Sequence, residues 1–512
     1  MSDLQVLIAG AGPTGLTLAC DLARRGVAVR VIDQAPGPFP GSRAKGVTPR
    51  TVEVLDDLGL AQEAVRAATP LVMRHYGREG TFTDQRPASY WQTSPAEPHP
   101  QLLLPQWRTE AILRSLLGRL GVTVEYATRL ARFEQDGEQV TATVQRDAGG
   151  QVIVADYLVG CDGGHSTVRK QLGVAFEGAT HPGQTLLIGD VEVTGLRPDR
   201  LHLWADPERG LLQLCPFAGV TAWQVAVMTP AWQARPPAPS QEVFQRAVLE
   251  ITGMPQITLG APTWTSTYRV NVRMADRLRG GRVFLAGDAA HVHPPAGGLG
   301  MNTGIQDAYN LGWKLGLVLS GHAGDGLLDT YEGERLPIAA WALGTSTERL
   351  RAMTGEFGKG TDADLGVVNT DDTRQLRLGY RWSPLSREGH RQGVRAGDRA
   401  PDAPCRDAAG ASVRLFDIFR GPHFTLVGFG QSSRSSLDVV GDAWPGPLRT
   451  CLIAEAGTLT DADGHAADAY GVTGEAMVLV RPDGHLALTV EAHDTVAVLN
   501  YLEALKTLLS GR

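Results

Sequence analysis

Cysteine is scarce in this sequence, with five residues scattered along 512, and no two of them form a CxxC pair. A disulfide framework and a zinc ribbon both need closely spaced cysteines, so neither is expected. Scattered reduced thiols fit the cytoplasm. No apolar run approaches the ~18 residues needed to cross a bilayer, so we expect no membrane association.

A surplus of basic residues is also missing. The 48 Lys and Arg residues stand against 55 Asp and Glu residues, a net charge of −7. Nucleic acid is therefore not an expected partner. Glycine, in contrast, is abundant, at 61 of the 512 residues, well above the usual share of about 7%. The glycines follow no period, which excludes collagen, and the chain length suggests about three domains.

The first 33 residues have the pattern of a strand, a glycine-rich turn, a helix and a second strand. Residues 4–9 form a short apolar run, typical of a strand buried on both faces. The turn reads GAGPTG at 10–15, and apolar residues then recur at helical spacing up to Gly26. Residues 27–32 predict a second strand that ends at Asp33. Such a unit begins a parallel sheet.

This turn matches the GxGxxG fingerprint of dinucleotide binding. Gly10 permits the tight turn, Gly12 lets a pyrophosphate approach the backbone, and Gly15 lets the helix pack close to the strand. The helix N-terminus favours negative charge, and Asp33 is placed to bind a ribose hydroxyl. An ordinary glycine-rich turn is the alternative.

A second motif, DGGHSTVR at 162–169, comes after a predicted strand at 152–159. Histidines in this motif and the next, His165, His291 and His293, share their spacing with no carboxylate or cysteine. No metal site is therefore expected.

A third motif, GDAAH at 287–291, leaves a predicted strand at 283–286 and continues into PPAGGLGMN at 294–302. Asp288 at the strand end would accept a hydrogen bond from a sugar hydroxyl. The backbone from Gly297 to Asn302 would present N–H groups to a polar ring edge.

Together the three motifs resemble those of the class A flavin-dependent aromatic monooxygenases, which have the para-hydroxybenzoate hydroxylase fold. The resemblance covers about residues 4–345. From about residue 396 the chain is similar to the thioredoxin-like C-terminal domain of the phenol hydroxylase branch and of the aromatic polyketide hydroxylases. Without a CxxC pair, that domain is expected to have no disulfide exchange activity.

The implied fold is α/β. A Rossmann-like FAD-binding domain would occupy residues 1–175 and 276–395, the second part with a helical segment and a linker. A substrate-binding domain would be inserted at 176–275, and a thioredoxin-like domain would follow at 396–512. The residues themselves support the insertion, because 185–275 alternate apolar and polar side chains, which predicts a largely antiparallel sheet.

The resemblance also assigns roles to single residues. FAD would be bound by Gly10, Gly12, Gly15, Asp33, Arg43, Gln106, Asp162, Asp288, Gly300, Met301 and Asn302. Arg43 matches the arginine beside the mobile flavin, and Asp288 would bind the ribityl chain. Asp162 belongs to a motif proposed to serve both FAD and NADPH. Arg43 and Pro294 are the candidate catalytic residues.

The implied chemistry consumes NADPH and O₂. NADPH would reduce FAD, O₂ would add to give a C4a-hydroperoxide, and its distal oxygen would pass to an electron-rich aromatic ring. The partners would be a small aromatic substrate and O₂, and the protein a monomer or homodimer.

Trp223, Trp264 and Tyr268 are candidate walls of the substrate pocket, with packing in the domain core as the alternative. A broad apolar pocket suits a polycyclic polyketide phenol. The alternatives are a single-ring phenol hydroxylase of aromatic catabolism, a Baeyer–Villiger or epoxidising monooxygenase, and a non-catalytic flavoprotein.

Overall fold

The computed structural model describes residues 4–77, 81–147, 149–206, 208–232, 236–294, 298–357, 371–387 and 393–508. A six-stranded sheet forms the core of the first part, in the order β18-β19-β11-β1-β2-β7. Its strands are β1 (Val6–Ala9), β2 (Val29–Ile32), β7 (Val124–Glu125), β11 (Tyr157–Gly160), β18 (Arg279–Gly280) and β19 (Val283–Leu285). All neighbours pair in parallel except β18 with β19. This is the parallel sheet that the N-terminal pattern predicts.

Helix α1 (Pro13–Ala23) packs against both α4 (Gln106–Arg119) and α7 (Leu299–Leu319). Most residues of α1 and α7 are buried, because each helix is covered on more than one side. The other helices of this part are α2 (Pro49–Asp57), α3 (Ala61–Ala67), α5 (Thr167–Gln171) and α8 (Asp329–Phe357). Two short strands, β3 (Gly46–Val47) and β6 (Leu102–Leu103), pair with each other.

The single strand predicted at 152–159 is in fact two strands. β10 (Gly149–Ala155) pairs in an antiparallel sheet with β9 (Val140–Arg146), which pairs with β8 (Arg129–Gln135). After Asp156 the chain enters β11 in the parallel sheet. Both strands bury apolar side chains, so one continuous apolar run conceals the change of sheet.

The second large sheet runs β20-β17-β12-β15-β14-β13-β4-β5, and β16 pairs with β12. Its strands are β4 (Met73–Tyr76), β5 (Phe82–Gln85), β12 (Phe176–Thr194), β13 (Leu201–Asp206), β14 (Gly210–Pro216), β15 (Ala222–Met228), β16 (Thr258–Leu259), β17 (Trp264–Ala275) and β20 (His291–Val292). All its pairs are antiparallel except β13 with β4. The sheet therefore contains the predicted insertion at 176–275, and it also recruits β4 and β5, which the sequence assigned to the FAD-binding part.

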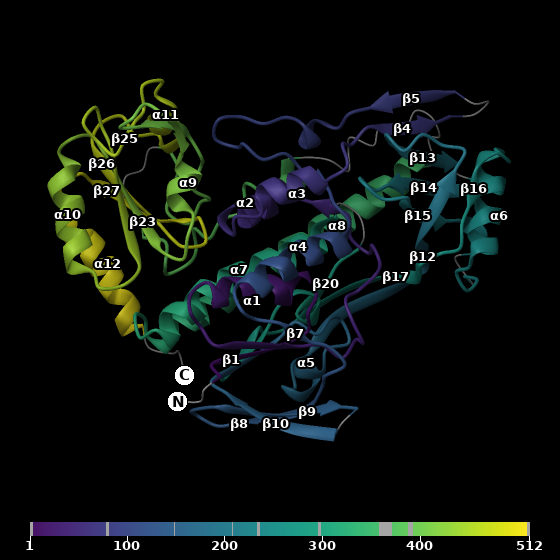
Figure 1. The fold of residues 1–512 in the computed structure, drawn as a ribbon, viewed down its shortest axis with the longest axis horizontal. Coiled ribbons are helices and arrows are strands. Elements are labelled where there is room, and N and C mark those ends of the chain that lie inside the picture. Colours follow the sequence, from purple (N-terminus) through teal and green to yellow (C-terminus); the bar gives the residue numbers. More distant parts are fainter. Residues whose placement is uncertain are drawn as a thin grey trace.

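Helix α6 (Gln241–Thr252) covers one face of this sheet (Figure 1). Successive residues of a strand point to opposite faces. Leu212, Leu214 and Val225 bury their side chains with Phe244 of α6. The residues between them, such as Gln213 and Gln224, therefore face the other side, toward the FAD-binding part.

The C-terminal sheet runs β22-β21-β25-β24-β23-β26-β27. Its strands are β21 (Pro404–Asp407), β22 (Ser412–Arg414), β23 (Phe424–Phe429), β24 (Leu448–Ile453), β25 (Leu459–Thr460), β26 (Ala476–Val480) and β27 (Leu486–Glu491). Its helices are α9 (Leu415–Phe419), α10 (Ser433–Ala443), α11 (His465–Tyr470) and α12 (Thr495–Thr507). A parallel pair, β23 with β24, continues into the antiparallel pairs of β26, as expected for a thioredoxin-like domain.

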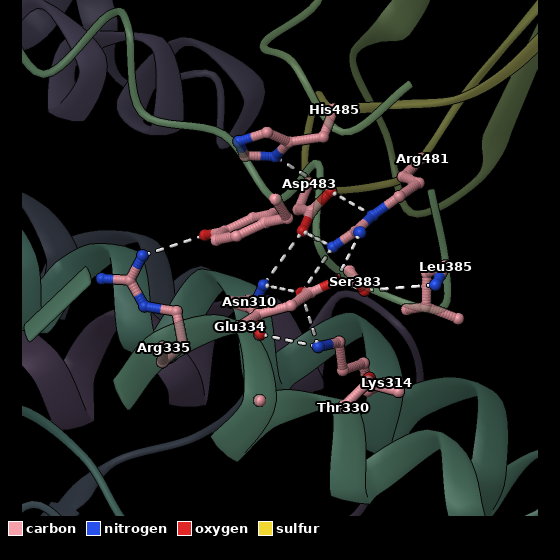
Figure 2. Close-up of polar contacts among 12 residues, drawn as sticks. Asn310, Lys314, Thr330, Glu334, Arg335, Ser383, Leu385, Arg481, Asp483 and His485 are labelled. Carbon is pink, nitrogen blue, oxygen red and sulfur yellow. Dashed lines mark hydrogen bonds and ion pairs between the residues drawn. The ribbon is translucent and has the colours of Figure 1, made fainter. Parts of the chain in front are cut away.

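This domain shares its interior with the first part of the chain. Trp313 and Leu317 of α7 lie in one apolar cluster with Phe424 and Leu426 of β23. Beside that cluster, a fully buried polar network joins Arg481 and Asp483 of the C-terminal domain to Glu334 of α8 (Figure 2). Among the described residues no helix combines the length and the hydrophobicity of a membrane span.

Candidate active site

The glycine turn between β1 and α1 has no room for side chains at two of its three positions. Gly10 has φ = 107°, and a Cβ there would lie 2.2 Å from the Cys161 carbonyl oxygen. A Cβ on Gly15 would lie 2.0 Å from the Gly10 carbonyl oxygen. Around Gly12, in contrast, nothing lies within 4 Å of an added Cβ. Gly12 is the N-cap of α1 and has no side chain to bond to the first turn, so the helix start is open to a phosphate.

Asp33 fastens this turn to the end of β2. Its Oδ2 accepts a hydrogen bond from the Ala11 N–H at 2.7 Å, and its Oδ1 accepts one from the Ala35 N–H at 2.8 Å. A carboxylate has about four acceptor positions. Asp33 therefore holds the loop and still retains lone pairs for a ribose hydroxyl.

The Asp162 side chain forms hydrogen bonds within its own loop. Its oxygens accept hydrogen bonds from the Ser166 hydroxyl at 2.5 Å and from the Thr167 N–H at 2.7 Å, so it holds the start of α5. Burial raises the pKa of this carboxyl. These bonds give Asp162 a loop-forming role, and its contact with FAD or NADPH stays a prediction.

The three motifs converge, although more than a hundred residues separate each from the next. Arg169 of the second motif donates to the Ala289 carbonyl of the third at 2.8 Å. A Cβ on Gly287 of the third motif would lie 2.5 Å from Thr14 Oγ1 of the first. The first and second motifs meet where Gly10 faces Cys161. One continuous site is thus built from the ends of β1, β11 and β19, where ligands bind in parallel sheets.

Asp288, Arg43 and Tyr268 come from three distant segments and lie within electrostatic range of one another. The Asp288 side chain is exposed, yet surrounding protein desolvates the carboxyl and raises its pKa, an effect that the neighbouring His291 and Arg43 oppose. Burial also raises the pKa of Tyr268, whose hydroxyl donates to the His293 carbonyl at 2.6 Å. An accessible carboxylate inside such surroundings is suited to bind a polyol.

A buried chain of hydrogen bonds supports this loop from behind. His291 Nε2 lies 2.6 Å from Asp307 Oδ2, and His293 Nε2 lies 2.8 Å from His291 Nδ1. Burial alone would raise the pKa of Asp307, but His291 and Arg335 hold it at about 2. Asp307 is therefore ionised and forms a hydrogen bond with His291 Nε2. Burial lowers the pKa of His293 to about 3, so this ring is neutral.

The sequence reasoning missed Asp307 as a functional residue. The sequence contained a signal for this residue, because Asp307 is a carboxylate in the middle of a helix and its neighbours in that helix are nearly all buried. Buried acids of this kind are paired, and Arg335 Nε supplies the pair at 2.7 Å.

Gln106 and Asn302 fix the loop that carries Arg43. The Gln106 backbone N–H donates to the Ala44 carbonyl at 2.8 Å, and its side-chain oxygen accepts from the Ala44 N–H at 3.4 Å. Asn302 accepts from the Thr48 N–H at 3.0 Å and donates to the Gly46 carbonyl at 2.9 Å. The side chains of Gln106 and Asn302 thus position this loop. Their contact with FAD stays a prediction.

Gly300 and Met301 lie in the first turn of α7, after Gly298, whose φ is 64°. Pro294 is buried. Residues 295–297, including Gly297, lie outside the described residues.

The three predicted substrate residues do not share one surface. Trp264 and Tyr268 lie on the side of the sheet that faces the FAD-binding part: a Cβ on Gly41 would meet the Trp264 indole, and Tyr268 reaches the third motif. Trp223 lies on the opposite face, 3% exposed, in the cluster against α6. The structure therefore corrects the placement of Trp223, because alternation along a strand does not reveal which face meets the cofactor.

Comparison with known proteins gives concordant matches. A family model described as an FAD binding domain matches residues 3–346, and one described as an aromatic-ring hydroxylase C-terminal domain matches residues 394–510. A flavin-dependent monooxygenase of Mycobacteroides abscessus is 41% identical over 512 residues, covering 98% of this chain and 99% of the relative. The 12-dehydrotetracycline 5-monooxygenase/anhydrotetracycline 6-monooxygenase of Streptomyces rimosus is 34% identical, covering 94% and 95%. A crystal structure of aklavinone-11 hydroxylase with FAD and aklavinone is 28% identical, has a TM-score of 0.84 and covers 99% of each chain.

Proposed function

The chain belongs to the flavin-dependent aromatic-ring monooxygenases, and from that premise we propose that it hydroxylates a polycyclic phenol at the expense of NADPH and O₂. The observation that carries the proposal is the convergence of the three motifs on one site. Bound FAD would supply the chemistry, passing electrons from NADPH to O₂ and delivering one oxygen atom to the ring.

The protein's own residues would bind and orient. The open start of α1 at Gly12 would receive the pyrophosphate, Asp33 the ribose and Asp288 the ribityl chain. Arg43 lies on the loop between β2 and β3, within range of Asp288, where it would guide the flavin ring between positions. Gly300, Met301 and Asn302 at the start of α7 would face the ring.

The substrate would lie between the flavin and the sheet of residues 176–275, against Trp264 and Tyr268. Relatives support the polycyclic class, since 12-dehydrotetracycline and anhydrotetracycline appear in the name of one and aklavinone is bound by another. The chain would act in the cytoplasm, where its free cysteines stay reduced.

The test is a ligand screen on the purified FAD-loaded enzyme. Anhydrotetracycline and aklavinone should stimulate NADPH oxidation far more than phenol or 4-hydroxybenzoate, and mass spectrometry should show a product with one added oxygen. Efficient turnover of single-ring phenols without response to polycycles would replace the proposal with the catabolic alternative. A product in which oxygen is inserted into a carbon–carbon bond would favour the Baeyer–Villiger alternative.

A further inference from the structure

A polar cluster lies on the cofactor-facing side of the substrate sheet, where an apolar surface was expected. Lys45, on the loop before β3, donates from Nζ to Gln213 Oε1 at 2.6 Å and also to Gln224 Oε1. Gln213 lies on β14 and Gln224 on the neighbouring β15. Asp190 of β12 is paired directly with Gln224, so its side chain lies on the same face.

The cluster lies beside the predicted substrate wall. Asp190 of β12 is paired with Trp264 of β17, the tryptophan whose indole lies against Gly41. Two residues before Lys45, Arg43 reaches the region of Asp288 and Tyr268. One short loop thus presents one cation to the cofactor region and a second cation to the sheet.

The hydrogen bonds inside the cluster are incomplete. An ammonium group has three donors, and two acceptors among the described residues reach Lys45. Asp190 Oδ1 is buried without a well-aligned hydrogen bond among the described residues, and the neighbouring Ser42 opposes the rise in the Asp190 pKa that burial causes. Buried polar atoms without full hydrogen bonding destabilise a fold, so a cluster with an unused ammonium donor and a poorly bonded carboxylate oxygen fits a site that a ligand completes.

The charge of Lys45 is poorly compensated. Burial lowers the pKa of Lys45, and the nearby Asp190 and Cys215 favour its protonated form. Burial raises the pKa of Asp190 to about 6 and that of Cys215 to about 11, so only one weak carboxylate offsets the ammonium. Both glutamines are neutral and orient the ammonium without neutralising it. Lys45 is intermediate between buried and exposed, so part of its side chain stays accessible.

We propose that Lys45 binds an anionic oxygen of the aromatic substrate, an ionised phenol or an enolised carbonyl, and that Gln213 and Gln224 are positioning residues for its ammonium. This inference rests on the proposed function, since it names the group of the polycyclic phenol that the enzyme recognises. On binding, the phenol O–H bond breaks and its proton passes to solvent, while the ammonium holds the phenolate oxygen. A phenolate ring is richer in electrons than a phenol ring, so it accepts an oxygen atom more readily.

The test measures the pKa of a bound phenol. The FAD-loaded enzyme is titrated with 1,8-dihydroxyanthraquinone and with anhydrotetracycline, and the phenolate absorbance is followed against pH in difference spectra. We expect the wild type to lower the probe's pKa by at least one unit, which corresponds to at least tenfold tighter binding of the anion than of the neutral form. Lys45→Met should abolish this shift, and Lys45→Arg should retain most of it. Lys170→Met, which removes an exposed lysine of α5, is the matched control. The methylated probe 1,8-dimethoxyanthraquinone, which cannot ionise, should bind wild type and Lys45→Met alike.

Each outcome decides. If the probes bind and their pKa in the Lys45→Met complex equals that in the wild-type complex, the inference is overturned while the proposed function stands. If Lys45→Met fails to hold FAD, Lys45→Gln takes its place, because it keeps a hydrogen-bonding side chain and removes the charge. A probe pKa in that variant equal to the wild-type value also overturns the inference. If the wild type neither binds these polycycles nor oxidises NADPH with them, the proposed substrate class fails and the inference fails with it.

Discussion

Arg481 and Glu334 form a two-point ion pair across the boundary between the C-terminal domain and helix α8, and neither side chain is exposed (Figure 2). Arg481 Nη1 and Nη2 donate to the two Glu334 oxygens at 2.7 and 2.9 Å. Lys314 of α7 donates to the same carboxylate at 2.8 Å, and Asp483 accepts from Arg481 at 2.6 Å. Because α7 begins at the cofactor loop, this network joins the C-terminal domain to the element that carries Asn302 and Asp307.

Removing Arg481 should therefore destabilise the whole protein. Arg481→Met leaves Glu334 and Asp483 buried with less cationic compensation, and breaking a buried pair in this way costs about 3–5 kcal/mol. The measurement is the free energy of unfolding in urea, followed by fluorescence. Arg381→Met is the matched control, because Arg381 is 57% exposed in its pair with Asp398, and an exposed pair contributes under about 1 kcal/mol. Equal losses in the two variants would contradict a structural role for the network.

The glycine turn allows a test that separates folding from cofactor binding. Gly15→Ala should destabilise the fold, because its Cβ would lie 2.0 Å from the Gly10 carbonyl oxygen. Gly12→Ala should fold like the wild type, because nothing lies within 4 Å of its Cβ, but it should lose FAD, because the methyl group occupies the space of the pyrophosphate. Thermal unfolding of the apoprotein and FAD fluorescence titration measure the two effects. If Gly12→Ala holds FAD normally, the pyrophosphate does not approach this residue.

Much of the fold could be predicted from the sequence because local sequence patterns indicate the individual strands and helices. The strand, turn and helix at the N-terminus follow from an apolar run, three glycines and helical spacing, and the structure confirms them as β1, α1 and β2. The antiparallel sheet follows from alternation in 185–275. The change of sheet at Asp156 could not be predicted, because a buried strand reads the same in either sheet.

The site was predicted where a motif fixes backbone geometry and missed where distant side chains meet. Pro482-Asp483-Gly484 reads locally as a turn, and nothing nearby indicates that Asp483 accepts from Trp313 of α7. The role proposed for Lys45 likewise depends on its contacts with Gln213 and Gln224, which lie more than 160 residues away in the sequence. The sequence left open whether Trp223 lines the pocket or packs in the core, because period-2 alternation gives two faces without naming the one that meets the cofactor, and the structure packs it against α6.

Asp288 should contribute strongly to FAD affinity. Asp288→Ala removes a charged acceptor, and a hydrogen bond to a charged group contributes about 1.5–3 kcal/mol, equivalent to roughly one to two decades of affinity. Equilibrium titration of the apoprotein with FAD gives the dissociation constant. Asp438→Ala, which removes an exposed carboxylate from α10, should leave that constant unchanged. A change below twofold in Asp288→Ala would exclude a direct bond to the cofactor.

Arg43 should affect reduction of the cofactor more than its retention. Its guanidinium lies 5.3 Å from the centroid of Phe39 and its side chain is exposed, so it is free to follow a moving ring. Arg43→Ala should retain most FAD but slow the substrate-stimulated reduction by NADPH, measured by stopped-flow absorbance under anaerobic conditions. Unchanged reduction rates would refute this role, and simple loss of FAD would indicate a static contact instead.

His293 should make the protein less stable in mild acid. Its pKa is lowered to about 3 in the fold from about 6.5 in an unfolded chain, so between these values the unfolded chain binds a proton that the folded chain does not. The stability contributed by the neutral ring is fully present above pH 6.5 and falls as the pH drops toward 3, by about 2 kcal/mol between pH 7 and pH 5. Asp307, with a pKa of about 2, stays ionised throughout this window. His293→Gln keeps a side chain that can form a hydrogen bond with His291, and it cannot titrate. We therefore expect urea unfolding at pH 7 and pH 5 to show a smaller loss for His293→Gln than for the wild type, by about those 2 kcal/mol. Equal losses in the two proteins would mean that His293 does not carry this pH dependence.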